Sequence, residues 1–137
     1  MTVPREYLAA SADFERFLDD LASALTCEST AQSYVAVRTV MHAFRDRLDP
    51  DETLQFASCL PTGLRALFVA EWEPSPRRPW LDRHMMSREI GVSAPDAGEF
   101  VKTVACVLAR HTDSGRLHHA LGRLAPQAAS FWSTVRD

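Results

Sequence analysis

Residues 47–72 read RLDPDETLQFASCLPTGLRALFVAEW, and this stretch decides the fold. Asp49 stands where a helix N-cap is needed, Pro50 fits the first helical position, and Glu52 completes the pattern of a capping box. A second helix begins after Pro61, because proline restarts a chain that it cannot continue as a helix. The expected apolar faces of these two helices are Leu54, Ala57 and Leu60 in the first, and Leu64, Leu67, Phe68 and Trp72 in the second.

The same helical periodicity extends to both sides of this stretch. Upstream, apolar residues recur at helical spacing over 14–25 and 37–48, after a short turn of helix that Pro4 introduces. Downstream, residues 73–80 (EPSPRRPW) contain three prolines and cannot be helical. Further helices are expected over 81–90, from about 95 to 111, after Asp113 and after Pro126. No segment alternates as a strand does, so we expect an all-α fold, a compact bundle of seven or eight helices.

Length and composition favour one globular domain outside the membrane. The chain has 137 residues, 46% of them hydrophobic and 24% charged, and no apolar run long enough for a membrane span. The beginning, MTVPREYLAASADFERF, lacks the apolar core of a secretory signal. Three widely spaced cysteines indicate reduced thiols and a cytoplasmic location. Arginine supplies fourteen of the fifteen basic residues, which is typical of a GC-rich bacterial genome.

Charge is distributed unevenly along the chain. Residues 1–76 hold twelve acidic and six basic residues, whereas residues 77–137 hold six acidic and nine basic ones. The resulting net charge of −3 disfavours a dedicated nucleic-acid binder. The asymmetry favours either two halves that pack on each other or steered contact with a partner or a second copy.

The two ends of the sequence also resemble each other. Phe17 and Leu21 match Phe100 and Val104 at an offset of 83, whereas later pairs match at 63 or 64. This pattern predicts an imperfect internal duplication whose second copy has lost its second helix. We therefore expect a single domain over 1–137, with a four-helix N-terminal repeat (1–72), a Pro/Arg-rich connector (73–94) and a shortened second repeat (95–137).

Several dipeptides carry a resemblance to a known family: Phe17-Leu18, Arg47-Leu48, Leu60-Pro61, Leu64-Arg65 and Leu67-Phe68, followed by Trp72 and by Glu99-Phe100-Val101. In these the sequence resembles the family called domain of unknown function 2267, well over residues 13–72 and partly over 95–132. The resemblance implies an all-helical fold of two related halves in a cytosolic, mostly bacterial protein. It implies no chemistry, because the family has no established catalytic residues.

The missing helix has a physical consequence. Each helix of a repeat buries an apolar stripe against its neighbours, so we expect Phe100, Val104 and Leu121 to be partly uncovered. Three alternatives for what covers this stripe stay open: the 81–90 segment with Met85 and Met86, a second copy of the chain, or a foreign partner.

Three histidines are the candidates for a metal site. His111, His118 and His119 fall within HTDSGRLHH, and imidazoles bind transition metals where two or three converge. Neighbouring helical residues point about 100° apart, so at most one of His118 and His119 faces His111. A histidine near a helix C-terminus is also favourable without any metal. We therefore expect no metal and no cofactor.

The connector combines basic residues with an aromatic side chain. Arg77, Arg78, Trp80 and Arg83 have the composition of a phosphate-binding and base-stacking segment. Acidic residues interrupt it, and we expect its arginines to pair instead with the acidic first half.

The sequence contains none of the strong nucleotide, metalloprotease or hydrolase motifs, which favours a function other than catalysis. The leading hypothesis is a non-enzymatic helical interaction module that binds a protein partner or itself. The alternative is a small-molecule- or metal-binding protein, with an enzyme as one form of it, whose site lies between the two halves near His111, His118 and Trp132. The candidate interaction residues are Arg77, Arg78, Trp80, Arg83, Phe100, Val104 and Leu121.

Overall fold

The computed structural model describes residues 2–90 and 97–133 of the chain. Over these residues it is all-α, without a strand, which confirms the predicted fold class. The eight expected helices are present, and the expected turn of helix before them is α1. The helices are α1 (Arg5–Leu8), α2 (Ala10–Leu25), α3 (Thr30–Arg45), α4 (Pro50–Ser58), α5 (Thr62–Val69), α6 (Arg83–Ile90), α7 (Ala97–His111), α8 (Ser114–Gly122) and α9 (Pro126–Phe131). None of the helices in this described part has the length and hydrophobicity of a membrane span.

Two helix starts follow the capping signals in the sequence. The carboxylate of Asp49 accepts from the backbone N–H of Glu52 at 2.8 Å, and Glu52 accepts from the backbone N–H of Asp49 at 3.1 Å. This is the predicted capping box of α4. Asp113 caps α8 in the same way, accepting from the N–H of Arg116 at 2.9 Å. Each such cap contributes about 1 kcal/mol and fixes where its helix begins.

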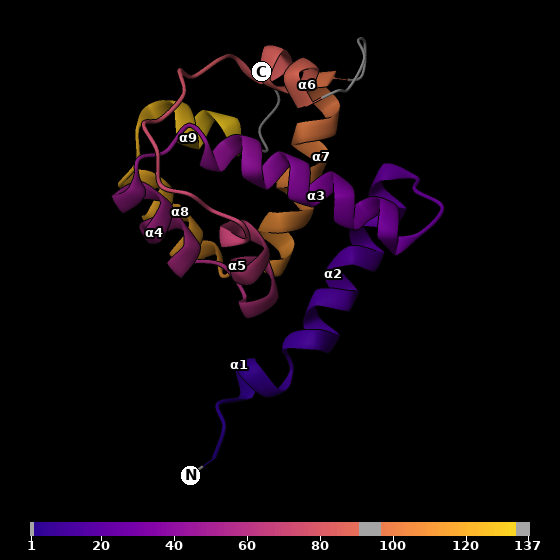
Figure 1. Cartoon of the computed structure of the whole chain (residues 1–137). Coiled ribbons are helices and arrows are strands. Elements are labelled where there is room, and N and C mark those ends of the chain that lie inside the picture. Colours follow the sequence, from indigo (N-terminus) through magenta and orange to yellow (C-terminus); the bar gives the residue numbers. More distant parts are fainter. Residues whose placement is uncertain (1, 91–96, 134–137) are drawn as a thin grey trace.

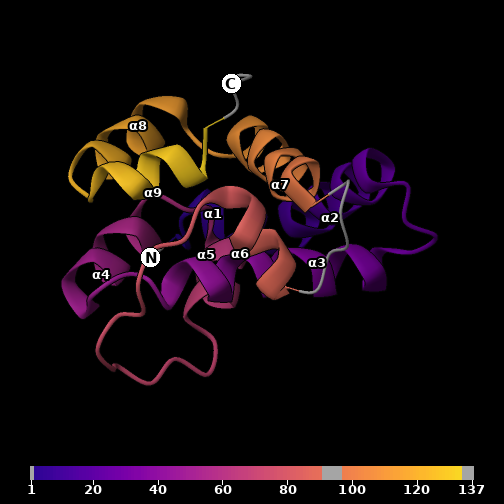
Figure 2. The ribbon, with the colours of Figure 1, turned by 90° about the horizontal axis from the view of Figure 1, so that it is seen from above.

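The helices surround one apolar interior. α2 packs against α3, α5 and α7, and α7 also packs against α6. α8 packs against both α9 and α4. The view from above shows α4, α8 and α9 gathered at one side of the molecule and α2 at the opposite side (Figure 2). In Figure 1, α1 and the N-terminus project from one end of α2, away from the other helices.

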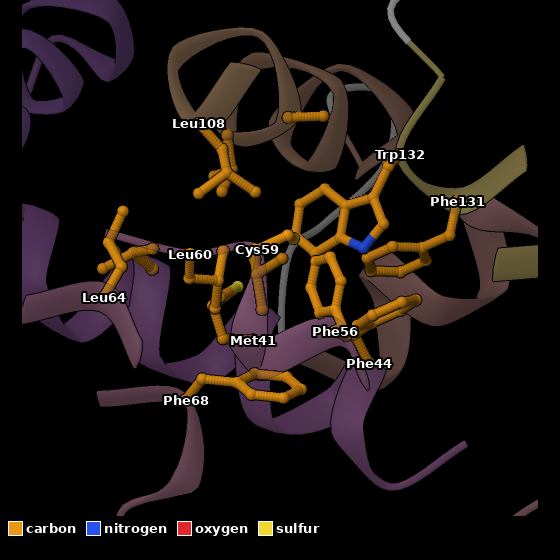
Figure 3. Packing of buried hydrophobic residues seen from close by; sticks show 14 of the residues in the cluster. Met41, Phe44, Phe56, Cys59, Leu60, Leu64, Phe68, Leu108, Phe131 and Trp132 are labelled. Atoms are coloured by element: carbon orange, nitrogen blue, oxygen red, sulfur yellow. The ribbon is translucent and has the colours of Figure 1, made fainter. Parts of the chain in front are cut away.

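Aromatic rings fill the interior where α3, α4 and α9 meet (Figure 3). The ring of Phe44 lies 4.8 Å from that of Phe56 and 5.1 Å from those of Phe131 and Trp132, between centroids. Trp80, from the connector, packs on the same ring at 5.8 Å. Such pairs contribute about 0.5–1.5 kcal/mol each beyond the area they bury. Phe44 therefore joins side chains from both halves of the chain.

A glycine permits the close contact between α2 and α5. A Cβ atom added to Gly63 would lie 2.9 Å from the Cβ of Phe14 and 3.0 Å from two of its ring atoms. Any side chain at this position would push the two helices apart, so Gly63 sets their separation.

The predicted faces of α4 and α5 need two corrections. Leu54 is 55% exposed, whereas Ala57 and Leu60 are buried as predicted. Thr53 and Phe56 complete the buried side of α4. This side of α4 buries Phe56, which is larger than Leu54. The hydroxyl of Thr53 can be buried because it donates a hydrogen bond to the carbonyl of Asp49 at 3.0 Å.

α5 ends at Val69, before the predicted Trp72. Glu71 adopts a left-handed conformation, with φ of 58°, which turns the chain out of the helix. Arg45 donates to the carbonyls of Phe68 and Ala70 at 2.9 Å each, so the end of α5 is fixed from outside the helix.

The stripe expected to be uncovered is mostly covered by the chain itself. α6 packs on α7, and both Met86 and Val104 have no exposed surface, so the expectation of an uncovered Val104 is wrong. Phe100 and Leu121 are partly buried against the core. Of the two methionines expected to fill the gap, Met86 does so and Met85 is exposed.

The arrangement of the helices does not test the predicted internal duplication or its boundaries. Residues 91–96, which include the end of the connector and the start of the second repeat, lie outside the described residues, as does Val135 in the last predicted helix. In the predicted duplication, α7, α8 and α9 would correspond to α2, α4 and α5. The internal duplication and its boundaries at 1–72, 73–94 and 95–137 stay predictions.

Candidate functional site

The histidines proposed as metal ligands have separate surroundings. His111, at the end of α7, pairs through Nε2 with Oδ2 of Asp20 at 2.6 Å, and its ring edge packs on Phe17. His118 and His119 are exposed on α8. In residues 2–90 and 97–133 no group of three or more histidine, cysteine or acidic side chains is placed to hold a metal ion. Trp132 belongs to the aromatic core and His118 is exposed on α8, so the site predicted near His111, His118 and Trp132 stays a prediction.

Arg77 and Arg78 of the connector form contacts with residues of the neighbouring helices and loops. Arg77 lies 3.7 Å from the carboxylate of Glu52, as expected for pairing with the first half. The backbone N–H of Arg78 donates to the carbonyl of Asp46 at 2.7 Å, but its side chain pairs with Glu89 of α6, in the connector itself. The side chain of Arg83 lies outside the described residues.

The interaction residues predicted from the sequence do not form one surface. Trp80 packs near the C-terminal end of α3, on Phe44, whereas Phe100 lies beside its N-terminal half, near Val35. Val104 is fully buried, and Leu121 is half-buried against the core. Of this set, Phe100 is the one that lines a pocket within the described part of the chain.

Sequence reasoning missed three side chains, of Arg45, Arg65 and His42, that contact carbonyl groups at the ends of helices. Besides Arg45, the side chain of Arg65 donates to the carbonyls of Ala57 and Leu60 at 3.2 and 3.0 Å, at the end of α4. The ring Nε2 of His42 lies 2.9 Å from the carbonyl of Leu67. Burial lowers the pKa of His42 and of Arg45. Because these side chains satisfy carbonyl groups at helix C-terminal ends, we assign them structural roles.

The first unexplained surface is the N-terminal arm, residues 2–9. Val3, Tyr7 and Leu8 are 51%, 52% and 70% exposed, and α1 buries none of its residues. Large apolar side chains gathered on a projecting segment are typical of a contact surface.

The second surface is an apolar pocket of about 320 Å³, the α2–α3–α7 pocket. Its lining residues come from the end of α2, the N-terminal half of α3 and the start of α7. They are Leu25, Cys27, Gln32, Val35, Ala36, Thr39 and Phe100. Val35 is 60% exposed, so this pocket is an apolar opening at the surface.

The third surface is a pocket of about 250 Å³ between α4 and α8, the α4–α8 pocket. Gln55, Ser58 and Cys59 line it from the first half of the chain. Burial raises the pKa of the Cys59 thiol to about 11, so this cysteine is protonated at neutral pH and is a poor nucleophile. From the second half, Arg116, His119, Ala120 and Arg123 line it.

A fourth pocket, of about 250 Å³, lies between the start of α2 and the start of α5. Arg16 pairs with Asp13 and His111 pairs with Asp20, so the remaining charged group of the lining is the carboxylate of Glu6. Arg16 is therefore not available to attract an anionic ligand to this pocket.

The comparisons with known proteins assign the chain to a family without a known activity. Residues 14–131 match the family described as "Uncharacterized conserved protein (DUF2267)". A search of curated proteins finds no match. The family match spans more than half of the chain and covers helices α2 to α9. The chain therefore belongs to the DUF2267 family.

Proposed function

We propose that this protein is a non-enzymatic interaction module that associates with a second copy of itself through the N-terminal arm. The observation that carries the proposal is the exposure of Val3, Tyr7 and Leu8 on a segment whose helix, α1, packs mainly on α2. Burying a side chain of this kind stabilises a complex by about 1.5–3 kcal/mol. These side chains are already partly buried, so each contributes a fraction of this amount, and a two-fold dimer adds the contributions of both arms.

The α2–α3–α7 pocket offers the matching surface. Its apolar residues Leu25, Val35 and Phe100 suit the apolar side chains of the arm. Glu28 and Glu99 are exposed, and each is next in sequence to a residue that lines the pocket. Arg5 on the arm has no ion pair within the described residues and complements these carboxylates.

An arm cannot reach the pocket of its own chain. The arm leaves one end of α2 and the pocket lies at the other end, about 24 Å away for a helix of 16 residues. Two copies with antiparallel α2 helices satisfy both contacts at once, since each arm then meets the other copy's pocket. This is the self-complementary arrangement of a two-fold dimer.

Sedimentation velocity over a series of protein concentrations tests the proposal. We expect a monomer–dimer equilibrium for the natural protein and a monomer for the double variant Tyr7→Ser/Leu8→Ser. Leu54→Ser is the matched control, because Leu54 is equally exposed but lies on α4, away from both surfaces. A natural protein that is monomeric at every concentration, or a dimer that the arm variant leaves intact, would overturn the proposal.

A mixing experiment tests the reciprocal geometry. Val35→Arg places a charge in the pocket without disturbing the core, because Val35 is exposed. The arm variant and the pocket variant should each be monomeric alone and should form a weak heterodimer when mixed. That heterodimer retains one intact arm–pocket contact. Failure to recover any association on mixing contradicts the exchange of arms.

We also infer a bacterial cytoplasmic location, without nucleic acid as a partner. The three free cysteines and the acidic net charge support this placement.

A second candidate function, small-molecule binding between the two halves, is favoured by the α4–α8 pocket. This pocket lies between one helix of the first half and one of the second.

A further inference from the structure

We propose that the α4–α8 pocket binds a small organic molecule through an oxyanion group, a phosphate or a carboxylate. The inference rests on the second candidate function and does not depend on self-association. It names the chemical class of ligand that the pocket selects.

The cationic side of the pocket comes from a single face of α8. Arg116, His119 and Arg123 are spaced by three and then four residues, so their side chains point the same way along the helix. All three are exposed at the opening of the pocket. The guanidinium groups of arginine match phosphate and carboxylate oxygens through paired hydrogen bonds.

These arginines differ from most others in the described part of the chain. Arg38, Arg47, Arg77 and Arg78 each have a carboxylate partner, and Arg45 and Arg65 donate to helix carbonyls. The side chains of Arg116 and Arg123 have neither kind of partner among residues 2–90 and 97–133. Two unneutralised cations beside one concave surface attract an anion more strongly than scattered surface charges do.

The α4 side of the pocket adds a polar group that lacks a partner. Oε1 of Gln55 is buried and has no hydrogen bond in the described structure. Rotation of the amide by half a turn places its NH₂ group at that position, where it can donate to a ligand oxygen. An oxyanion between the two arginines and this amide would thus receive donors from both helices.

The floor of the pocket explains why the ligand should also have an apolar part. Cys59 and Ala120 line the pocket and are almost fully buried. A small apolar group against this floor gains contact area, while an oxyanion reaches the arginines at the opening. The structure thus favours an organic phosphate or carboxylate over the free inorganic ion.

Isothermal titration calorimetry with phenyl phosphate, inorganic phosphate and phenol tests the oxyanion and the apolar part of the ligand separately. We expect phenyl phosphate to bind most tightly, inorganic phosphate more weakly and phenol weakest. The double variant Arg116→Gln/Arg123→Gln should weaken phenyl phosphate binding at least about tenfold. Arg110→Gln is the matched control, because Arg110 is an exposed arginine of α7 outside the pocket, and it should bind as the natural protein does.

A second variant tests the α4 side of the pocket. Gln55→Glu has nearly the same shape but places a negative charge beside the site, so phenyl phosphate binding should weaken again. Equal binding of phenyl phosphate to the natural protein and the double arginine variant would overturn the inference. Phenol binding as tightly as phenyl phosphate would retain small-molecule binding but contradict the oxyanion class. Absence of binding by all three probes would contradict both.

Discussion

Arg47 and Glu89 form an ion pair that joins the end of α3 to α6. Arg47 has almost no exposed surface and also donates to the carbonyls of Ala43 and Pro79, at 3.0 and 3.4 Å. Partial burial would raise the pKa of Glu89, but the hydrogen bond from Arg47 and the charges of Arg47 and Arg78 lower it overall. The buried Arg47 therefore binds the connector at two points, the carbonyl of Pro79 and the carboxylate of Glu89.

Removing the charge of Glu89 should destabilise the protein much more than removing the charge of Glu71, whose ion pair with Arg38 is more exposed. Glu89→Gln leaves the buried Arg47 without a counter-charge, and we expect a loss of about 3 kcal/mol in the free energy of unfolding. Glu71→Gln breaks the more exposed Arg38–Glu71 pair and should cost less than about 1 kcal/mol. Urea denaturation of both variants gives the comparison, and equal effects would show that Arg47 does not need its partner.

His42 should make stability depend on pH in the weakly acidic range. Burial holds its pKa in the folded state below the usual 6.5, against the opposing effect of its bond to Leu67, and the charges of Arg45 and Arg38 lower it further. The unfolded chain then binds the proton more readily. Stability is therefore complete above pH 6.5 and declines as the pH falls through the lower folded-state pKa.

The test compares the free energy of unfolding between about pH 5 and pH 7. His42→Gln retains a donor for the carbonyl of Leu67 but cannot titrate, so its stability should change less over this range. His118→Gln, at an exposed position on α8, should retain the slope of the natural protein. A His42→Gln variant with an unchanged slope would assign the pH dependence to another group.

Gly63→Ala should destabilise the contact between α2 and α5. The added methyl group would overlap Phe14 at 2.9 Å, which forces that side chain or the helix to move. We expect a loss of about 1–3 kcal/mol, measured by thermal or chemical unfolding. In the background Phe14→Gly the same substitution should cost much less, because both the Cβ atom and the ring that the new methyl group would meet are gone. A cost that is the same in both backgrounds would show that the contact with Phe14 is not its source.

Gly122→Ala provides the control for this experiment. Nothing lies within 4 Å of a Cβ atom at Gly122, which is the last residue of α8. Alanine should therefore be neutral or stabilise by up to about 1 kcal/mol through helix propensity.

Thr26→Gly should stabilise the protein slightly. Thr26 ends α2 in a left-handed conformation, with φ of 56°, which is unfavourable for a β-branched residue. Glycine adopts this conformation without strain, although it adds freedom to the unfolded chain. We expect a net gain of roughly 0.5–1 kcal/mol in urea denaturation. A loss of stability would mean that the hydrogen bond from the Thr26 hydroxyl to the carbonyl of Leu25 outweighs the strain.

Local sequence signals predicted several of the helix starts. The capping box at Asp49, the cap at Asp113 and the prolines at helix starts depend on neighbouring residues alone, so the sequence contains what they require. Leu54 was misplaced because the choice between neighbouring helix faces depends on what packs opposite them. Likewise, the end of α5 depends on Arg45, which is distant in sequence and whose role no local pattern indicates.

The candidate sites were harder to predict. Phe100 was identified from the pattern of the second half, and it does line a pocket. Val104 was assigned to the same surface, but α6 covers α7, and sequence periodicity does not reveal which segment fills a gap. The α4–α8 pocket joins residues about sixty positions apart, so its arginines and Gln55 could not be grouped from the sequence.

The position of Phe44 has a consequence for how the chain gains and loses its structure. Its ring touches Phe56 of α4, Trp80 of the connector and Phe131 of α9, so the interior is complete only when these segments are together. A chain cleaved within residues 73–79 should yield two fragments that stay associated in the folded state. Once separated, neither fragment retains the full interior, so each should refold only by complementation with the other. The intact protein should accordingly melt in a single cooperative transition.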